Sequence, residues 1–272
     1  MRYLLCIGTV FTMLTASIAA VHAEEAMVRL HAAGSLKPAM TALSEAFTAA
    51  QHIKVEASFG ASGLLRERLE KGEAGDVYAS ADMGNPEKLA KQGKAGPVVL
   101  FARNRLCAIV RPGLQVTPET LLRTMLDPTI KLGTSTPGND PAGDYAWALF
   151  AKADVVQPGA GDILRFKALK LTGSPSAPQP PPGRNVYAWN VMERHADVYL
   201  AYCTAGQAAA TEVPDIGVVD LPPDLAVGAD YGLTALQHAN AKTTLPFILY
   251  VLSTEGQSIL AHYGFDAPLI RR

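Results

Sequence analysis

The stretch Val55-Glu56-Ala57-Ser58-Phe59-Gly60-Ala61-Ser62-Gly63 runs from a predicted strand into the start of a predicted helix. The helix continues from Leu64 to Lys71, and Gly72 ends it. The same order occurs upstream, where the apolar run Val28 to Ala32 precedes Gly34-Ser35 and a helical pattern of apolar residues. Because strands alternate with helices, we expect an α/β fold with a largely parallel sheet and helices on both faces.

The same alternation extends along most of the chain. Further strands are predicted over residues 76–80, 106–110, 131–134, 198–203 and 247–252. Further helices are predicted to start at Thr117-Pro118 and to cover residues 142–152, 186–194 and 257–263. Five prolines between Ser174 and Gly183 predict an extended surface loop.

Composition excludes several functional classes. The 272 residues include 24 Lys and Arg against 25 Asp and Glu, whereas a nucleic-acid-binding surface needs a clear excess of basic residues. Hydrophobic residues make up 49% and charged residues 18%, which indicates a globular chain of one large or two modest domains. Three cysteines without a Cys-x-x-Cys pair and scattered histidines predict no metal-cation site, and we expect no cofactor.

The first residues have the pattern of a secretory signal. Arg2 is followed by an apolar core from Leu4 to Leu14, and Val21-His22-Ala23 has small residues at the spacing of a cleavage site. We therefore expect residues 1–23 to be removed after Ala23 and the mature protein to be exported to the periplasm. The alternative is a membrane anchor, because Tyr3 to Val21 is uncharged and almost long enough to span a bilayer.

Four predicted helices begin with small or polar residues directly after a strand or loop. These starts are Gly34-Ser35, Ala61-Ser62-Gly63, Pro141-Ala142-Gly143 and Asn185-Val186. In a parallel sheet such helix starts lie at the carboxyl edge of the strands, where their free N–H groups favour an anion. The alternative for each single site is an ordinary helix cap.

These motifs resemble the molybdate-binding proteins of ABC transporters. The resemblance rests on Ala32-Ala33-Gly34-Ser35-Leu36, on Phe59 to Gly63, on Asp76 to Asp82, on Pro141 to Ala146 and on Tyr263-Gly264-Phe265. It implies a two-lobed periplasmic binding protein fold of the second class, with mixed, mostly parallel sheets flanked by helices and two crossover strands. The implied division is 24–104 plus 221–272 for lobe I and 105–220 for lobe II.

The resemblance also implies a set of oxyanion ligands. Ser35 and Ser62 would each give a hydroxyl and an N–H group, and Ala142 and Val186 would give backbone N–H groups. Asn185 is the alternative to Val186, because the proline-rich loop leaves the register open by one residue. Tyr202 would add a hydroxyl, although ordinary strand packing explains a buried tyrosine equally well.

The function that this resemblance implies is solute capture and not catalysis. The protein would bind molybdate or tungstate, pass it to the membrane permease of an ABC transporter, and act as a monomer. Sulfate and small organic anions remain alternatives, as does phosphate if Asp140 or Asp144 turns inward to accept its proton. A serine hydrolase that uses Ser35 or Ser62 is a further alternative, and His31 is the only base close in sequence to Ser35.

The sequence departs from the family pattern in three places. Gly63 stands where the family often has a serine, and Ser174 to Gly183 has the character of an insertion. Cys107 and Cys203 are also additions. Both fall in predicted core strands that the family layout brings close together, so we expect a disulfide in an oxidising compartment. The alternative is two buried thiols.

Overall fold

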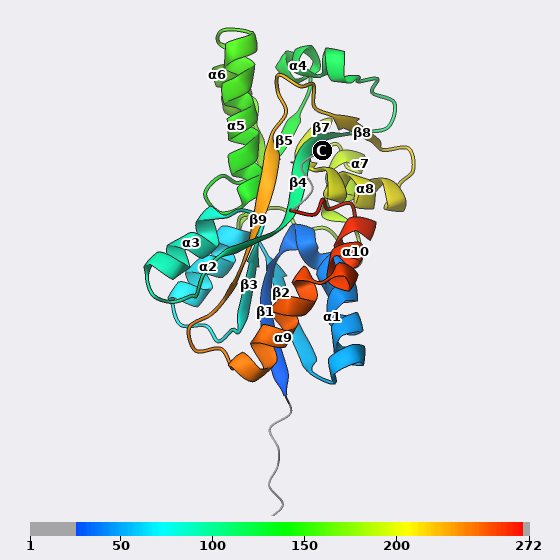
Figure 1. Cartoon of the computed structure of the whole chain (residues 1–272). Helices are drawn as coiled ribbons and strands as arrows, with labels where there is room; N and C mark the ends of the chain where they lie inside the picture. Colours follow the sequence, from blue (N-terminus) through cyan, green and yellow to red (C-terminus); the bar gives the residue numbers. More distant parts are fainter. Residues whose placement is uncertain (1–25, 269–272) are drawn as a thin grey trace, which may run out of the picture.

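The computed structural model describes residues 26–268. The chain begins with three βα units, whose elements are β1 (Met27–Ala33), η1 (Gly34–Leu36), α1 (Lys37–Gln51), β2 (Lys54–Gly60), α2 (Ser62–Glu70), β3 (Val77–Ser80) and α3 (Gly84–Lys91). The long strand β4 (Val99–Val110) then runs from this part of the molecule into the next (Figure 1).

A second set of elements follows β4. It comprises α4 (Pro118–Leu126), β5 (Leu132–Ser135), α5 (Pro141–Val156), α6 (Ala160–Lys167), β6 (Leu169–Thr172), α7 (Val186–Met192), β7 (Val198–Tyr202), α8 (Cys203–Glu212) and β8 (Gly217–Asp220). The chain then returns through β9 (Gly228–Ala235) and ends with α9 (Ala241–Leu252) and α10 (Thr254–His262) beside α1.

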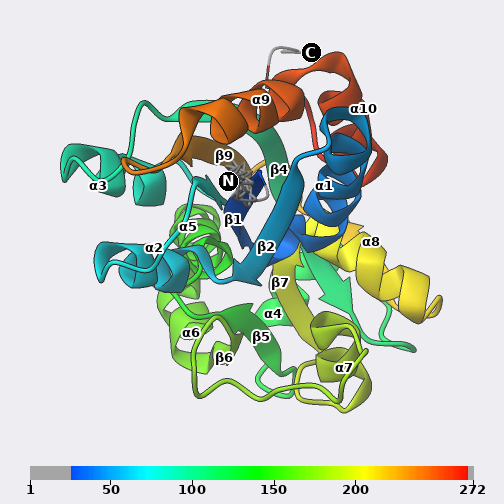
Figure 2. The same cartoon turned by 90° about the horizontal axis from the view of Figure 1, so that it is seen from below.

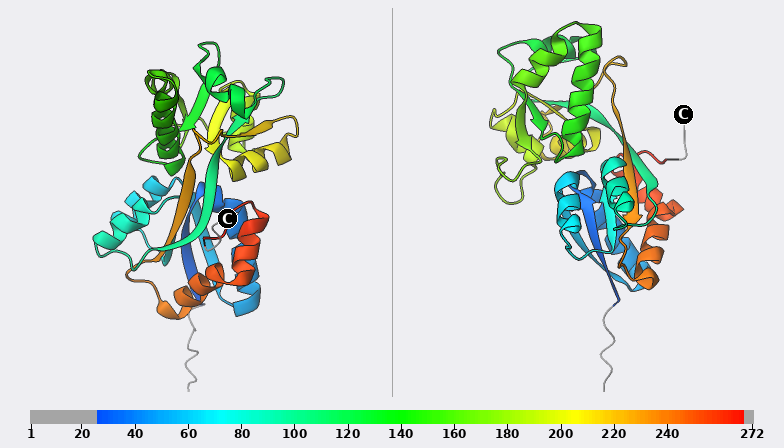
Figure 3. Two further views of the ribbon diagram at one scale, coloured as in Figure 1. Left: turned by 45° about the horizontal axis from the view of Figure 1, so that its top comes forward. Right: turned by 90° about the vertical axis from the view of Figure 1, so that its left-hand side faces the viewer.

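One mixed sheet joins the two sets. Its order is β2-β1-β3-β9-β4-β7-β5-β6, with β8 also paired to β4. The strands β1, β2 and β3 are parallel to one another, as are β5, β6 and β7, whereas every pairing of β4 and β9 is antiparallel. The alternation of strands and helices therefore builds both ends of the sheet, and two long strands connect them (Figure 3).

Strand β4 changes partners in the middle of its length. Arg105 pairs with Gly228 of β9, and the next residue, Leu106, pairs with Tyr202 of β7. We call β1–β3, η1, α1–α3, α9 and α10 the β1 half, and β5–β8 with α4–α8 the β5 half. The change of partner lies between residues 105 and 106, one residue after the predicted division, and the lobe boundaries stay a prediction.

Helices cover both faces of each half. In the β1 half, α1 packs against α9 and α10, with α2 and α3 on the opposite side (Figure 2). The Phe47 ring of α1 meets the Phe247 ring of α9 edge to face at 5.1 Å between centroids, and both rings are fully buried. None of the helices within residues 26–268 combines the length and apolar character that a membrane span needs. The predicted signal, residues 1–23, lies outside the described residues.

The strand predicted over residues 247–252 is wrong, because these residues form the second half of helix α9. Asn240 caps this helix through its side-chain oxygen, which accepts the Lys242 N–H at 3.1 Å. The buried residues Thr243, Phe247 and Val251 are spaced four apart, which is a helical period. The prediction failed because a run of apolar and β-branched residues resembles a buried strand when the cap is overlooked.

Other predictions of elements are confirmed. Thr117 caps α4, with Pro118 in its first turn, and the helices predicted to begin near residues 142 and 186 are α5 and α7. Residues 174–183 contain no strand or helix. The fold class is confirmed as a mixed α/β fold with helices flanking the sheet.

Candidate functional site

Ser62 lies at the carboxyl edge of the parallel strands in the β1 half. It is the first residue of α2 and is completely buried. Its hydroxyl oxygen accepts the Ala81 N–H at 3.1 Å, and its carbonyl accepts the Tyr78 hydroxyl at 2.7 Å. Because Tyr78 and Ala81 belong to β3 and the turn after it, the ends of β2 and β3 fix the position of the Ser62 hydroxyl.

Two tyrosines of the β5 half contact this turn. The Tyr145 hydroxyl of α5 and the Tyr202 hydroxyl of β7 each donate to the Ala81 carbonyl at 3.4 Å. Burial raises the pKa of both hydroxyls, so both keep their protons at neutral pH and can act as donors. Tyr202 is thus packed in the core, and its hydroxyl and that of Ser62 bond the same residue, Ala81.

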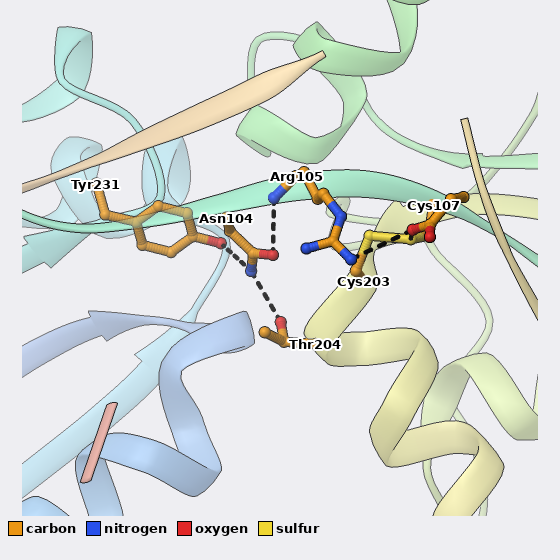
Figure 4. Close-up of a disulfide and its surroundings, with 7 residues drawn as sticks. Asn104, Arg105, Cys107, Cys203, Thr204 and Tyr231 are labelled. Carbon is orange, nitrogen blue, oxygen red and sulfur yellow. Dashed lines mark hydrogen bonds and ion pairs between the residues drawn. A yellow bond between two sulfur atoms is a disulfide. The ribbon is translucent and has the colours of Figure 1, made fainter. Parts of the chain in front are cut away.

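Ser35 is held by a different set of groups. Its Oγ lies 3.0 Å from the Tyr231 hydroxyl of β9. The Asn104 amide of β4 donates to that same hydroxyl at 3.3 Å and to Thr204 Oγ1 of α8 at 2.8 Å (Figure 4). Ser35 is therefore connected through both long strands to the β5 half. A cavity of about 400 Å³ borders Ser35 and Thr204.

The start of α5 is capped by a carboxylate. Asp140 Oδ1 accepts the Ala142 N–H at 3.1 Å, and Asp140 Oδ2 accepts the Ser135 hydroxyl at 2.6 Å. Burial raises the pKa of Asp140, while these two hydrogen bonds oppose the rise. The Ala142 N–H group, predicted as an anion ligand, is therefore already paired with a carboxylate of its own helix start.

The start of α7 is capped by its own side chain. The Asn185 side chain accepts the N–H groups of Tyr187 and Ala188 at 2.9 and 3.0 Å, so it is an ordinary helix cap. Val186 is the first helical residue and is half-buried. Among the described residues, no hydrogen bond joins Asn185 or Val186 to Ser35 or Ser62, and the ligand role of both stays a prediction.

Gly63 joins the two halves directly. Its N–H group donates to the Asn139 carbonyl at 2.8 Å, across the junction between α2 and the loop before α5. A Cβ at position 63 would lie 2.6 Å from the carbonyl oxygens of both Gly138 and Asn139. A serine at this position would therefore not fit without a shift of the loop before α5. The sequence shows the departure at Gly63, but it carries no signal that the loop before α5 lies beside this residue.

Cys107 and Cys203 form a disulfide with 4.8 Å between their Cα atoms. The bond ties β4 to the start of α8, next to the Asn104–Thr204 contact (Figure 4). Asp220 lies within 4.8 Å of both sulfurs. Because the sulfurs are bonded to each other, they offer no thiolate ligands to a metal ion.

His31 does not complete a hydrolytic site. Its Nε2 lies 3.0 Å from the Ala74 carbonyl and its Nδ1 lies 4.0 Å from the Glu73 carboxylate. No hydrogen bond connects it with Ser35 or Ser62 in the part of the chain that the structure describes. His31 is therefore not placed to act as the base for either serine.

Comparison with known proteins identifies the family. The model of the family described as bacterial extracellular solute-binding protein matches residues 28–266. The chain belongs to this family. It is 35% identical over 239 residues to the uncharacterized protein PM1146 of Pasteurella multocida, with 88% of this chain and 98% of the relative covered.

Two further similarities concern proteins with named ligands. The molybdate-binding protein ModA of Mycobacterium tuberculosis is 24% identical, with 87% of this chain and 83% of ModA covered. The sulfate-binding protein SubI of the same organism superposes with a TM-score of 0.71 at 18% identity, with 90% of this chain and 88% of SubI covered. The protein is thus an extracellular solute-binding protein and not an enzyme.

In this solute-binding protein, Gly63→Ala is expected to weaken the contact between the halves. The added methyl group meets two backbone oxygens, which cannot rotate away, at a cost of about 1–3 kcal/mol to the contact between Gly63 and Asn139. Small-angle scattering should show a larger radius of gyration. Gly60→Ala is the matched control, because its Cβ would meet only Leu65 at an ordinary 3.5 Å. Equal scattering from both variants would contradict the expectation.

Proposed function

We propose that this protein captures a tetrahedral oxyanion, molybdate or tungstate, and delivers it to a membrane permease. The observation that carries the proposal is the convergence of hydroxyl donors from both halves. Ser62 and Tyr202 meet at the same residue, Ala81. Ser35 lies at the end of β1, the strand next to β2. A fully deprotonated dianion needs donors only, and such a set supplies them without a fixed positive charge.

The proposed ligand set is Ser35, Ser62, Ala142, Val186 and Tyr202. Ser35 and Ser62 belong to the β1 half, and the other three belong to the β5 half. An anion held by both halves would favour their closed arrangement, in which Gly63 donates to Asn139. Export after Ala23, a monomeric state and release to an ABC permease complete the proposal. The low-identity relationship to ModA supports the choice of molybdate.

Sulfate is the second candidate, and a specific observation favours it. The superposition on SubI shows that the same fold occurs in a sulfate-binding protein. Sulfate has the same charge and shape as molybdate and would use the same donors, so the choice between them depends on the size of the closed site. A small organic anion is the remaining alternative.

Direct binding measurements test the proposal. Native mass spectrometry of the purified protein is expected to show one retained oxyanion, and isothermal titration calorimetry should give one site each for molybdate and tungstate. Sulfate binding tighter than that of either metal oxyanion would make the protein a sulfate carrier. If none of the three anions binds, the oxyanion proposal is wrong and an organic anion takes its place.

Ser62→Ala is expected to weaken molybdate binding roughly ten- to hundredfold. The estimate assumes the loss of one hydrogen bond to a charged group, about 1.5–3 kcal/mol, with a tenfold change for each 1.4 kcal/mol. Ser258→Ala is the control, because that exposed hydroxyl only bonds the Thr254 carbonyl within α10. Titration calorimetry below the melting range measures both variants, and unchanged affinity in Ser62→Ala would remove Ser62 from the ligand set.

A further inference from the structure

Asp140 occupies a position in which a carboxylate conflicts with a bound anion. Its Oδ1 is 3.1 Å from the Ala142 nitrogen, the group that the proposed function assigns to the oxyanion. The preceding residue, Asn139, accepts the Gly63 N–H at 2.8 Å, so the loop lies where the two halves meet. The Asp140 carboxylate is thus part of the junction and not a distant surface group.

Asp140 caps the positive N-terminus of α5, and no cationic side chain pairs with it among the described residues. Its hydrogen-bonding partners are the Ser135 hydroxyl at the end of β5 and the Ala142 N–H of α5. Two titratable groups influence the pKa of Asp140: Asp82, after β3, and Asp144, on α5. The charge of Asp140 in turn influences the pKa of three tyrosines, Tyr187 on α7 and Tyr199 and Tyr202 on β7. Gly173, after β6, lies beside the Asp140 side chain and offers only backbone atoms there.

No Lys, Arg or His lies within ion-pair distance of Asp140 in residues 26–268. Every titratable group that acts on it is an acid. Burial raises the pKa of this carboxyl, as expected for a carboxylate without a cationic partner. Burial therefore disfavours the ionised form of Asp140, while its two hydrogen bonds support it.

A second anion at the Ala142 N–H would further disfavour the ionised form. An oxyanion oxygen that bonds this nitrogen must approach it to about 2.7–3.2 Å, where Asp140 Oδ1 already lies. Two negative groups that share one N–H donor repel each other, which favours the uptake of a proton by one of them. That proton can then lie between a carboxyl oxygen and an oxyanion oxygen as an O–H···O hydrogen bond.

We propose that the oxyanion enters this site together with one proton from solvent, which Asp140 and the ligand share. The inference rests on the proposed function and narrows its substrate class. Molybdate, tungstate and hydrogen phosphate are basic enough to share a proton with a carboxyl group. Sulfate is a weaker base than these anions and accepts the proton poorly. Asp140 therefore selects for proton-accepting oxyanions.

The inference has a defined pH dependence. In the complex, the pKa of the Asp140–ligand pair is higher than the pKa of free Asp140. Affinity is therefore at its maximum below the pKa of free Asp140, where the proton is already bound. As the pH rises above the pKa of free Asp140, each unit weakens affinity up to tenfold, because one proton must be taken up. The weakening stops above the pKa of the complex. A donor-only site would show no such decline for an anion that is already fully deprotonated.

The test is titration calorimetry of the full mature chain with molybdate and with tungstate at pH 7, in buffers of different ionisation enthalpy. The wild-type protein is expected to take up about one proton per anion. Asp140→Asn keeps an oxygen for the Ala142 N–H and should bind without proton uptake, with a Kd that no longer follows pH. The matched control, Asp162→Asn, changes an exposed carboxylate of α6 that bonds Arg165, and it should keep the uptake.

The possible results separate this inference from the proposed function. Molybdate or tungstate binding without proton uptake by the wild-type protein overturns the role of Asp140 and leaves the oxyanion function intact. Proton uptake that persists in Asp140→Asn overturns it as well. If Asp140→Asn does not fold, the wild-type buffer series decides alone. If neither anion binds, the proposed function is wrong and this inference is wrong with it.

Discussion

Removal of the Cys107–Cys203 disulfide is expected to lower the free energy of unfolding by about 2–5 kcal/mol. The bridge closes a segment with a sequence separation of 96 residues. In the chain-entropy description a cross-link stabilises the native state by restricting the unfolded chain, and the effect grows with loop length to about 4.7 kcal/mol near 100 residues. The long loop therefore places the expected loss in the upper part of the range.

The position of the bridge adds a local consequence. Cys107 belongs to the part of β4 that pairs with β7 and β8. Cys203 begins α8 directly before Thr204, which accepts the Asn104 amide. Loss of the bond should therefore loosen α8 and the contact between Asn104 and Thr204, in addition to its effect on the unfolded chain.

Urea unfolding of the double variant Cys107→Ala/Cys203→Ala measures the effect against the oxidised wild-type protein. A reducing agent should destabilise the wild-type protein by a similar amount and leave the double variant unchanged, which controls for effects of the reagent. Thiol titration of the denatured, unreduced protein should find no free thiols from these cysteines. Two free thiols there would show that the bond does not form.

The parts of the fold that follow short-range rules could be predicted from the sequence. Apolar runs followed by small residues and helix starts placed β1, β2 and α2 within a few residues of their observed limits. Strand β9 was missed because Gly228, Asp230 and Gly232 interrupt its apolar pattern. It is a strand because β3 and β4 pair with it on both sides, and a partner distant in sequence leaves no local signal.

In the candidate site, too, local features could be predicted from the sequence, whereas contacts between distant segments could not. The sequence placed Ser35 and Ser62 at helix starts, because that position follows from local pattern. It did not predict that Tyr145 and Tyr231 contribute hydroxyls beside them, since both contacts join segments far apart in the chain. It named Asp140 as a residue that could turn inward, but only the structure shows which N–H group this carboxylate accepts.

Molybdate is expected to stabilise the protein by roughly 4 kcal/mol when present at about a thousand times its dissociation constant. The reason is mass action, because a ligand that binds only the folded, closed form removes protein from the unfolding equilibrium. For a chain of this size the gain corresponds to an increase of roughly 8–16 °C in Tm. Tungstate should give a similar shift, whereas chloride at equal ionic strength should give none.

Ser62→Ala should change both the stability of the ligand-free protein and the stabilisation by molybdate. Its buried hydroxyl accepts the Ala81 N–H at 3.1 Å, so the alanine variant leaves that N–H without a partner. The ligand-free variant should therefore lose about 1–3 kcal/mol of stability. At the molybdate concentration used for the wild-type protein, its ligand-dependent gain should also shrink by about 1.4 kcal/mol for each tenfold loss of affinity.

Differential scanning calorimetry with and without molybdate separates the two effects. If the gain is the same in both proteins, Ser62 stabilises the fold and does not contact the anion. If molybdate, tungstate and sulfate all leave the melting curve of the wild-type protein unmoved, the donors around Ala81 serve the contact between the two halves and not an oxyanion.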